Sequence, residues 1–458
     1  MKLWILTEER PKRPVIERII SRFGEDRELK VDISQVRIIP MIREHRFSFA
    51  YKVLGISVES IEEILLKIVS GESSFVDFLV FMQENEPDRN SVPLYAIEET
   101  KTSDAESRNT GVFQRSSKFV FVNFYYPTCK KIMLYNIQIE DDNEPTKTNI
   151  FGTRMLMTIG VEILGKDLDT SIFKPFDSID ELVDFKNSMR RAPAGNVQIQ
   201  IRRSGSRIEV SGRLYKSGSL SHDPNIGALS IIGKTLRVLG WEGEIIVTQH
   251  GLSQEHLSSG NKFIRIANQL NMGLAGLALP GSSLPREYWH YETSSEKVAT
   301  IFLHLALEEL PGVEVIYENH AGCERGYFKT MTGDPIAIHK YINNKKSNGV
   351  LRIPDSIVCD NRKKHILILE GKTVDRMSEG ISELADYDNL ESEYIQKYYG
   401  TYSVSRHVVL FGGIRGISHR SVTFVLTSNG GMMISEYTPD AIREAINNVL
   451  CSNNAGSD

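Results

Sequence analysis

The segment that decides the expected fold spans residues 354–372 and reads PDSIVCDNRKKHILILEGK. Pro354-Asp355 opens a short apolar stretch, and Glu370-Gly371-Lys372 ends a second one. Apolar stretches of this length, separated by a charged turn, predict two neighbouring strands. Two carboxylates and a lysine would then meet at strand ends, where such groups can hold a divalent metal beside a phosphate.

The same pattern occurs nearer the N-terminus. Asp77 ends the apolar stretch Ser-Phe-Val-Asp, within a predicted strand over 75–82, and Glu99-Thr100-Lys101 ends a second predicted strand over 93–100. A polar helix over 105–118 and a strand over 119–125 are predicted to follow. The motif around Lys372 is likewise followed by a predicted helix, over 377–399, and a predicted strand, over 404–411. The order strand–strand–helix–strand is therefore predicted twice, although the residues themselves do not repeat.

Acid-x-Lys triplets occur four times, at Lys30, Lys101, Lys186 and Lys372, which is no more than the composition gives by chance. Their setting separates them. Lys186 falls in a predicted helix, and Lys30 has no preceding acid on a strand. Only Lys101 and Lys372 end an apolar strand, follow an earlier Asp, and precede a helix and a further strand.

In this setting the chain resembles the PD-(D/E)xK nuclease superfamily, especially the type II restriction endonucleases. The motif at 354–372 matches the signature in full, whereas the N-terminal motif has Val76 where the signature has proline. The resemblance covers about 70–130 and about 295–415. It implies an α/β fold with mixed central sheets flanked by helices, two nuclease-like cores, and hydrolysis that leaves a 5′-phosphate.

The resemblance also implies which residues do the chemistry. Those assigned to catalysis are Asp77, Glu99, Lys101, Asp355, Glu370 and Lys372. The four acids among them would hold one or two Mg²⁺ ions in each centre, and each lysine would stabilise charge on the phosphate. Such enzymes often add an acid from the helix before the first strand, and the candidates by position are Glu17, Glu296 and Glu308.

The charge distribution allows a local DNA-binding surface. The net charge of −5 argues against a broad, nonspecific nucleic-acid coat, but the stretch 186–216 holds eight basic residues against one acid. The helix after the first catalytic strand would face the phosphate backbone in a nuclease of this type. The candidate DNA contacts are Arg108, Arg115, Lys118, Arg190, Arg191, Arg202, Arg203, Arg207 and Arg213. The alternative for all of them is an ordinary solvated surface.

The length of 458 residues predicts two or three domains. We expect a nuclease-like core over 1–190, a middle region over 191–290 as the candidate for DNA recognition, and a second core over 291–458. Ahead of the first motif, one helix is predicted over 15–23, after Pro14, and another over 61–69.

The expected location is the cytoplasm, with no membrane partner. No apolar run approaches the roughly 20 residues that cross a bilayer, and the N-terminus turns acidic too soon for a signal peptide. The four cysteines are scattered and form no C-x-x-C pair, so neither a zinc site nor a disulfide framework is indicated.

The leading hypothesis is a Mg²⁺-dependent restriction endonuclease that cuts double-stranded DNA at a specific sequence, with one centre for each strand of an asymmetric target. In one alternative, only one of the two cores is active, and the other serves DNA recognition. Another is a repair or recombination nuclease, which reads DNA structure, and the last is a noncatalytic DNA-binding protein. A restriction role would pair the chain with a DNA methyltransferase.

Overall fold

In the computed structural model, the chain forms two compact units. Unit 1 comprises Met1–Val69, Gln83–Asn85 and Tyr291–Asp458, and unit 2 comprises Ser70–Met82 and Glu86–His290. Residues 1–69 therefore group with the C-terminal part of the chain and not with 70–190. The structure describes residues 1–71, 74–100, 111–135, 146–165, 172–189, 199–216, 219–220, 225–318, 326–413 and 419–454.

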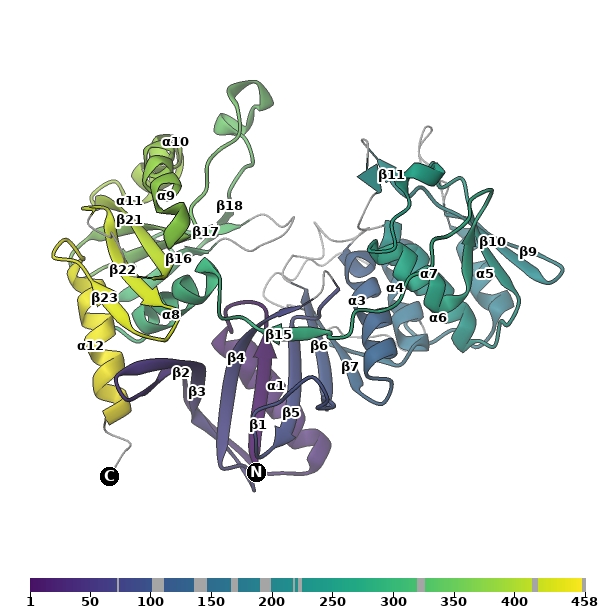
Figure 1. Ribbon diagram of the computed structural model, residues 1–458, viewed down its shortest axis with the longest axis horizontal. Helices are drawn as coiled ribbons and strands as arrows, with labels where there is room; N and C mark the ends of the chain where they lie inside the picture. Colours follow the sequence, from purple (N-terminus) through teal and green to yellow (C-terminus); the bar gives the residue numbers. More distant parts are fainter. Residues whose placement is uncertain are drawn as a thin grey trace. The chain divides into compact units, whose positions relative to one another are not determined.

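The N-terminal part of unit 1 has four neighbouring sheet strands and one covering helix (Figure 1). Its strands follow the order β2, β3, β4, β1, and only the β4–β1 pair is parallel. Helix α1 buries Val15, Ile16, Ile19, Ile20 and Phe23, which confirms the helix predicted from their spacing. The elements are β1 (Lys2–Thr7), α1 (Arg13–Arg27), β2 (Val31–Arg43), β3 (Arg46–Val58) and β4 (Glu63–Gly71).

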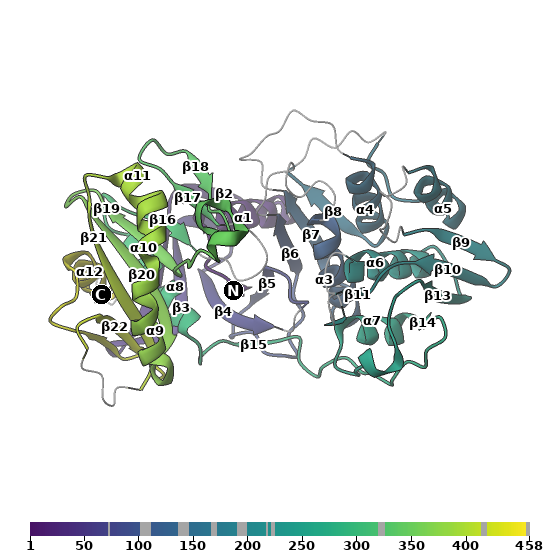
Figure 2. The same ribbon diagram turned by 90° about the horizontal axis from the view of Figure 1, so that it is seen from above.

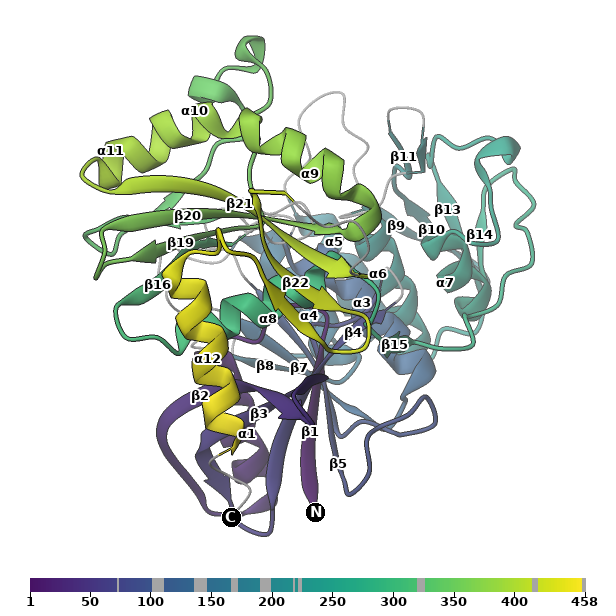
Figure 3. The same cartoon turned by 60° about the vertical axis from the view of Figure 1, so that its left-hand side comes forward.

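The C-terminal part of unit 1 is a six-stranded mixed sheet with the order β16, β19, β20, β21, β22, β23. The β19–β20 pair is antiparallel, and β20–β21 and β21–β22 are parallel. Helices α9, α10 and α11 cover one face, and α8 and α12 cover the other (Figure 3). The elements are α8 (Glu296–Glu308), β16 (Val313–Glu318), β17 (Tyr327–Lys329), β18 (Pro335–Ala337), β19 (Ser356–Asp360), β20 (His365–Thr373), α9 (Met377–Glu383), α10 (Asp388–Leu390), α11 (Gln396–Tyr399), β21 (Ser403–Gly412), β22 (Val422–Thr427), β23 (Met432–Ile434) and α12 (Asp440–Asn454).

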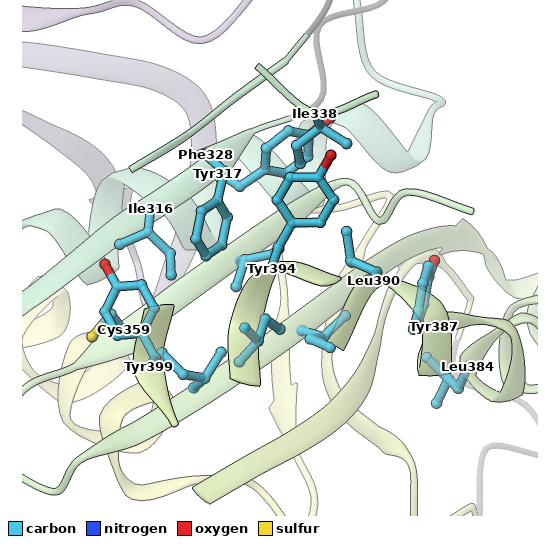
Figure 4. Close-up of a cluster of buried hydrophobic side chains, with 14 of the residues drawn as sticks. Ile316, Tyr317, Phe328, Ile338, Cys359, Leu384, Tyr387, Leu390, Tyr394 and Tyr399 are labelled. Carbon is cyan, nitrogen blue, oxygen red and sulfur yellow. The ribbon is translucent and has the colours of Figure 1, made fainter. Parts of the chain in front are cut away.

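One face of this sheet carries a continuous apolar core (Figure 4). Ile366 and Ile368 of β20 belong to the same buried cluster as Tyr387 and Tyr394, which come from the segment between α9 and α11. A 3₁₀ turn and a π turn interrupt the predicted helix over 377–399. The cluster fixes that segment against β20, and thereby fixes the polar side chains that flank the cluster.

Unit 2 contains four neighbouring sheet strands in the order β5, β6, β7, β8, of which β5–β6 is an antiparallel pair and the other two pairs are parallel. A second sheet has the order β14, β13, β10, β9. The elements are β5 (Phe78–Gln83), β6 (Tyr95–Thr100), α3 (Gly111–Tyr125), β7 (Lys130–Tyr135), α4 (Lys147–Thr158), β8 (Val161–Leu164), α5 (Ile179–Ser188), β9 (Ile201–Ser204), β10 (Arg207–Ser211), β11 (Tyr215–Lys216), β12 (Ser219–Leu220), α6 (Asn225–Val238), β13 (Glu244–Thr248), α7 (Lys262–Leu270), β14 (Met272–Leu274) and β15 (Trp289–Tyr291).

Two predicted elements were wrong in type. The segment 119–125, expected as a strand, is the last half of α3, and the parallel strand that follows is β7. Helix α3 is buried on most sides, so its sequence lacks the polar face that marks a helix. The segment 61–69, expected as a helix, lies largely in β4, whose side chains from Ile64 to Val69 are all buried. A short run buried on both faces has no period that separates helix from strand.

The α/β class with mixed sheets flanked by helices is confirmed, and the order strand–strand–helix–strand occurs in both units. In each case an antiparallel pair is followed by a crossover and a parallel strand. No helix in the described ranges combines the length and the apolar character needed to cross a bilayer.

His407 on β21 is expected to make unit 1 sensitive to acid. Burial lowers its pKa to about 4, and the neighbouring His365 adds to this shift. A histidine in the unfolded chain titrates near ~6.5, so between these pH values only the unfolded state binds the proton. We expect the wild type to lose up to about 1.4 kcal/mol of stability per unit as pH falls through this window, and His407→Gln to lose less. Urea unfolding near neutrality and at mildly acidic pH measures this, and equal losses in both proteins would contradict it.

Candidate active sites

The strand pairing of β19 with β20 fixes the position of Asp355. Ser356 pairs with Leu369, so the same register, continued by one residue, sets Asp355 opposite Glu370. Asp355 Oδ2 accepts a hydrogen bond from the backbone N–H of Gly371 at 2.7 Å. The structure thus brings the two predicted acids together at the end of one antiparallel pair.

Lys372 completes this group, which we call the unit 1 centre: Asp355, Glu370 and Lys372. Lys372 lies two residues beyond Glu370, so both side chains lie on the same face of β20. Its Nζ forms an ion pair with Glu370 Oε1 and lies 2.9 Å from Glu383 Oε2. The Tyr387 hydroxyl donates to Glu370 Oε2. The ammonium and the Glu370 carboxyl are therefore both held from two sides.

Two further residues of this centre, Glu383 and Tyr387, were not predicted from the sequence. Glu383 is the last residue of α9 and also forms an ion pair with Arg352. The ring of Tyr387 is fully buried, and its hydroxyl reaches Glu370. The only sequence signal for either role was their place on the helix that follows the Glu-x-Lys triplet.

The electrostatics of the unit 1 centre are those of crowded acids around one ammonium. Burial raises the pKa of Glu370, and the charge of Asp355 raises it further. Burial also raises the pKa of Asp355, although the Gly371 N–H offsets part of the shift. Burial acts against the charged form of Glu383, but hydrogen bonds, chiefly from Lys372, lower its pKa to about 2. Burial opposes the charge on Lys372 too, yet Glu370 and Glu383 raise its pKa.

A cavity of about 440 Å³ opens beside Asp355 on the α8 side of the sheet. Glu296, one of the additional acids predicted by position, lines this cavity, and its charge helps raise the pKa of Asp355. Glu308, another, is held instead by His304 at 3.0 Å and by Arg10 at 3.4 Å. The structure therefore brings Glu296 close to the centre and engages Glu308 in an ion-pair network.

The strand pairing of β5 with β6 has the same form in unit 2. Phe78 pairs with Ile97, so the register sets Asp77 opposite Glu98, and not opposite Glu99. The Asp77 N–H donates to Glu98 Oε2 at 3.1 Å, and Asp77 Oδ2 accepts from the Glu99 N–H at 2.7 Å. Glu99 therefore contributes its backbone to Asp77, in the way that Gly371 does in unit 1.

The ammonium in this second group comes from a helix. Lys118 Nζ lies 2.6 Å from Glu98 Oε1 and 3.5 Å from Asp77 Oδ1. The residue that corresponds to Lys372 in the register is Thr100, and Lys101 lies outside the described residues. We call Asp77, Glu98 and Lys118 the unit 2 centre. Glu98 stands in this centre where Glu99 had been predicted. Lys118 had been predicted only as a phosphate contact.

Both carboxyl groups of the unit 2 centre are buried. Burial raises the pKa of Glu98 to about 8, and the charge of Asp77 adds to the shift. Burial opposes the charge on Lys118, but Glu98 and Asp77 raise its pKa. Arg115 is buried as well, and its Nε donates to the Glu99 carbonyl at 3.2 Å and lies 3.6 Å from Glu98 Oε1. Arg115 is thus engaged inside the protein rather than presented to DNA.

The other predicted DNA contacts divide into two groups. Arg108, Arg190 and Arg191 lie outside the described residues. Arg202, Arg203, Arg207 and Arg213 are all exposed, and two of them form surface ion pairs, Arg203 with Asp180 and Arg207 with Glu244. Glu17, predicted as an additional acid for the first motif, is exposed on α1 and belongs to unit 1, whereas Asp77 belongs to unit 2.

The donor chemistry of both centres suits a hard divalent cation. Over the described ranges, no three Asp, Glu, His or Cys side chains converge as a ready-made metal site. Mg²⁺ is commonly held by only one or two carboxylates and keeps several waters. The residues that would hold it are Asp355 and Glu370 in unit 1, and Asp77 and Glu98 in unit 2.

Known proteins provide no match to the chain: no family model, no curated protein and no solved structure matches it. The functional proposal therefore rests on the geometry of the two centres.

Removing the ammonium from the unit 2 centre should destabilise unit 2 in a pH-dependent way. In Lys118→Met, Glu98 and Asp77 lose the ammonium beside them and Glu98 keeps only Arg115 at 3.6 Å, and breaking a buried pair costs about 3 kcal/mol when the acids stay charged. Near pH 6 Glu98 can take up a proton instead, because its pKa is already raised, so the cost should be larger near pH 9. Denaturant unfolding at both pH values measures the difference.

The matched control is Lys130→Met. Lys130 pairs with Glu162 at 3.0 Å in the same unit, but both side chains are partly exposed, and such pairs contribute less than about 1 kcal/mol. A Lys118→Met cost no larger than that of the control, or one independent of pH, would contradict the burial argument.

Proposed function

We propose that this chain is a Mg²⁺-dependent endonuclease that cuts double-stranded DNA, with one centre for each strand. The observation that carries the proposal is the shared register: in two separate sheets it pairs two carboxyls beside one ammonium. Two centres in one chain suit an asymmetric target, which the two-fold axis of a symmetric dimer does not match. We propose sequence-specific cleavage of the restriction type, with a methyltransferase to protect the host DNA.

The chain's own residues have distinct parts in this proposal. A bound Mg²⁺ would neutralise the phosphate and lower the pKa of a coordinated water. Lys372 and Lys118 keep a fixed positive charge at the place where negative charge grows on the phosphate. Glu383 and Tyr387 position Lys372 and Glu370 through the contacts described above. Strand backbone supports the aspartates, which limits their movement.

A second candidate is a nuclease in which only the unit 1 centre cuts. Arg115 lies 3.6 Å from Glu98 Oε1 and offsets negative charge that would attract a cation. Asp355, in contrast, lines a cavity of about 440 Å³. In this candidate the unit 2 centre would contribute to DNA binding alone.

Cleavage of supercoiled plasmid by single lysine variants separates these candidates. If each centre cuts one strand, Lys372→Ala and Lys118→Ala should each convert plasmid to nicked circles, and the double variant should leave it intact. If only unit 1 cuts, Lys372→Ala alone abolishes cleavage. Lys130→Ala serves as the comparison, because Lys130 pairs with Glu162 on the surface of the same unit, away from the centre, and we expect it to cut like the wild type. Full cleavage by the double variant would refute a nuclease role for both centres.

Cleavage should depend on a divalent metal through Asp355. We expect a chelator to abolish cleavage and Mg²⁺ to restore it, and Asp355→Asn to lower the rate by about 100-fold or more, because one anionic ligand is lost. Glu318→Gln is the control, since Glu318 lines the same cavity but binds Arg10 at 2.9 Å. Initial rates across a Mg²⁺ titration measure both effects. Equal losses in the two variants would point to general damage to the cavity.

A further inference from the structure

The second sheet of unit 2 has the same arrangement of strands as the two sheets that carry the unit 1 centre and the unit 2 centre. β9 pairs antiparallel with β10, and β10–β13 and β13–β14 are parallel. Helices α6 and α7 connect the parallel strands, as α3 and α4 connect β6, β7 and β8. The chain therefore contains this arrangement a third time, over residues 199–274.

The register of the third sheet identifies the residues that stand where the acids stand elsewhere. Ile201 pairs with Val210, so the continued register sets Gln200 opposite Ser211. The Gln200 N–H donates to Ser211 Oγ at 2.9 Å, as the Asp77 N–H donates to Glu98. An amide and a hydroxyl thus replace the two carboxyls.

The residue of the third sheet that corresponds to Lys372 also carries a positive charge. Arg213 follows Ser211 by two residues, so Ser211-Gly212-Arg213 corresponds to Glu370-Gly371-Lys372. Arg213 is exposed, and its Nε donates to the Tyr215 carbonyl at 3.0 Å. Across the described ranges no carboxylate pairs with it. Arg202, also exposed, donates to Gln200 Oε1 at 3.2 Å, so a second cation lies beside the same strand end.

Helix α6, which connects strands of the third sheet, packs against α3, the helix that carries Lys118 of the unit 2 centre. Helices α6 and α3 lie side by side, as Figures 1 and 2 both show. A Cβ at Gly227 of α6 would lie 1.6 Å from the Phe113 carbonyl oxygen of α3, so only glycine permits this approach. Because Lys118 also lies on α3, Arg213 and Lys118 belong to one packed body.

We propose that the third sheet is a core that does not cut, and that it binds the phosphate backbone of duplex DNA through Arg213. Gln200 and Ser211 lack the negative charge that holds Mg²⁺ and that repels a phosphate. A guanidinium keeps its charge at all working pH values and matches a phosphate with two parallel donors. Duplex DNA as the partner rests on the proposed function, since it is the substrate assigned to the two centres.

Arg207 offers a matched control on the same strand. It begins β10, whereas Arg213 lies two residues beyond the strand's other end, and both side chains are exposed. Arg207 Nε lies 2.7 Å from Glu244 Oε2, so its charge is already paired. A general basic surface would use both arginines, whereas the proposed core uses only Arg213.

The experiment measures binding of a fluorescent DNA duplex to the full chain in chelator, where no cutting interferes, over a series of salt concentrations. Arg213→Ala should weaken binding about tenfold and reduce the slope of log K against log salt by about 0.9, the value for one lost phosphate contact. Arg207→Ala should change neither quantity by more than about twofold. Both variants should unfold at the wild-type temperature, because both residues are exposed.

Each other outcome overturns the inference. The inference is wrong if Arg213→Ala binds DNA like the wild type. It is also wrong if Arg207→Ala loses as much affinity as Arg213→Ala, or if the wild type binds no duplex at low salt. A cleavage assay keeps the two proposals distinguishable: Arg213→Ala should raise KM and leave kcat unchanged, whereas the lysine variants lose kcat. A chain that binds duplex through Arg213 but never cuts it would refute the nuclease proposal and leave this one standing.

Discussion

The hydrogen-bond register of one antiparallel strand pair is the constraint on which each centre depends. Side chains alternate between the two faces of a strand, so a slip of one residue would move every side chain of the motif to the opposite face. In unit 1 the register pairs Asp355 with Glu370, and in unit 2 it pairs Asp77 with Glu98. The parallel strand beside each pair then buries the apolar residues that hold the register in place.

Charge compensation is the second requirement, and the two units meet it differently. In unit 1 the ammonium comes from the same strand as the acid, and Glu383 and Tyr387 on the covering segment hold the pair. In unit 2 the ammonium comes from α3. A lysine has a long, flexible side chain, so it can reach one point in space from a neighbouring strand position or from a helix. The acids have less freedom, because a short side chain must start close to the group that it contacts.

The unit 1 centre was predictable because its parts lie close in the sequence. A 19-residue segment carries Asp355, Glu370 and Lys372, and short apolar runs with a charged turn define both strands. The unit 2 centre was harder, because Glu98 and Glu99 are adjacent and only the pairing of Phe78 with Ile97 selects between them. The segment 119–125 was misassigned for a related reason: α3 packs against α4 and α6, and that burial removed the polar face of the helix.

Local sequence patterns were enough to predict the α/β class, the strands β19 and β20 with the helical segment after them, and the acids and lysine of the unit 1 centre. These follow from local patterns, since the period of apolar residues and the turn between strands depend on neighbours along the chain. The tertiary structure was needed to show that Glu98 faces Asp77, that Lys118 supplies the second ammonium, and that Glu383 and Tyr387 hold the first. Those choices depend on strand register and on helix packing, which join residues far apart in the sequence and leave no local pattern.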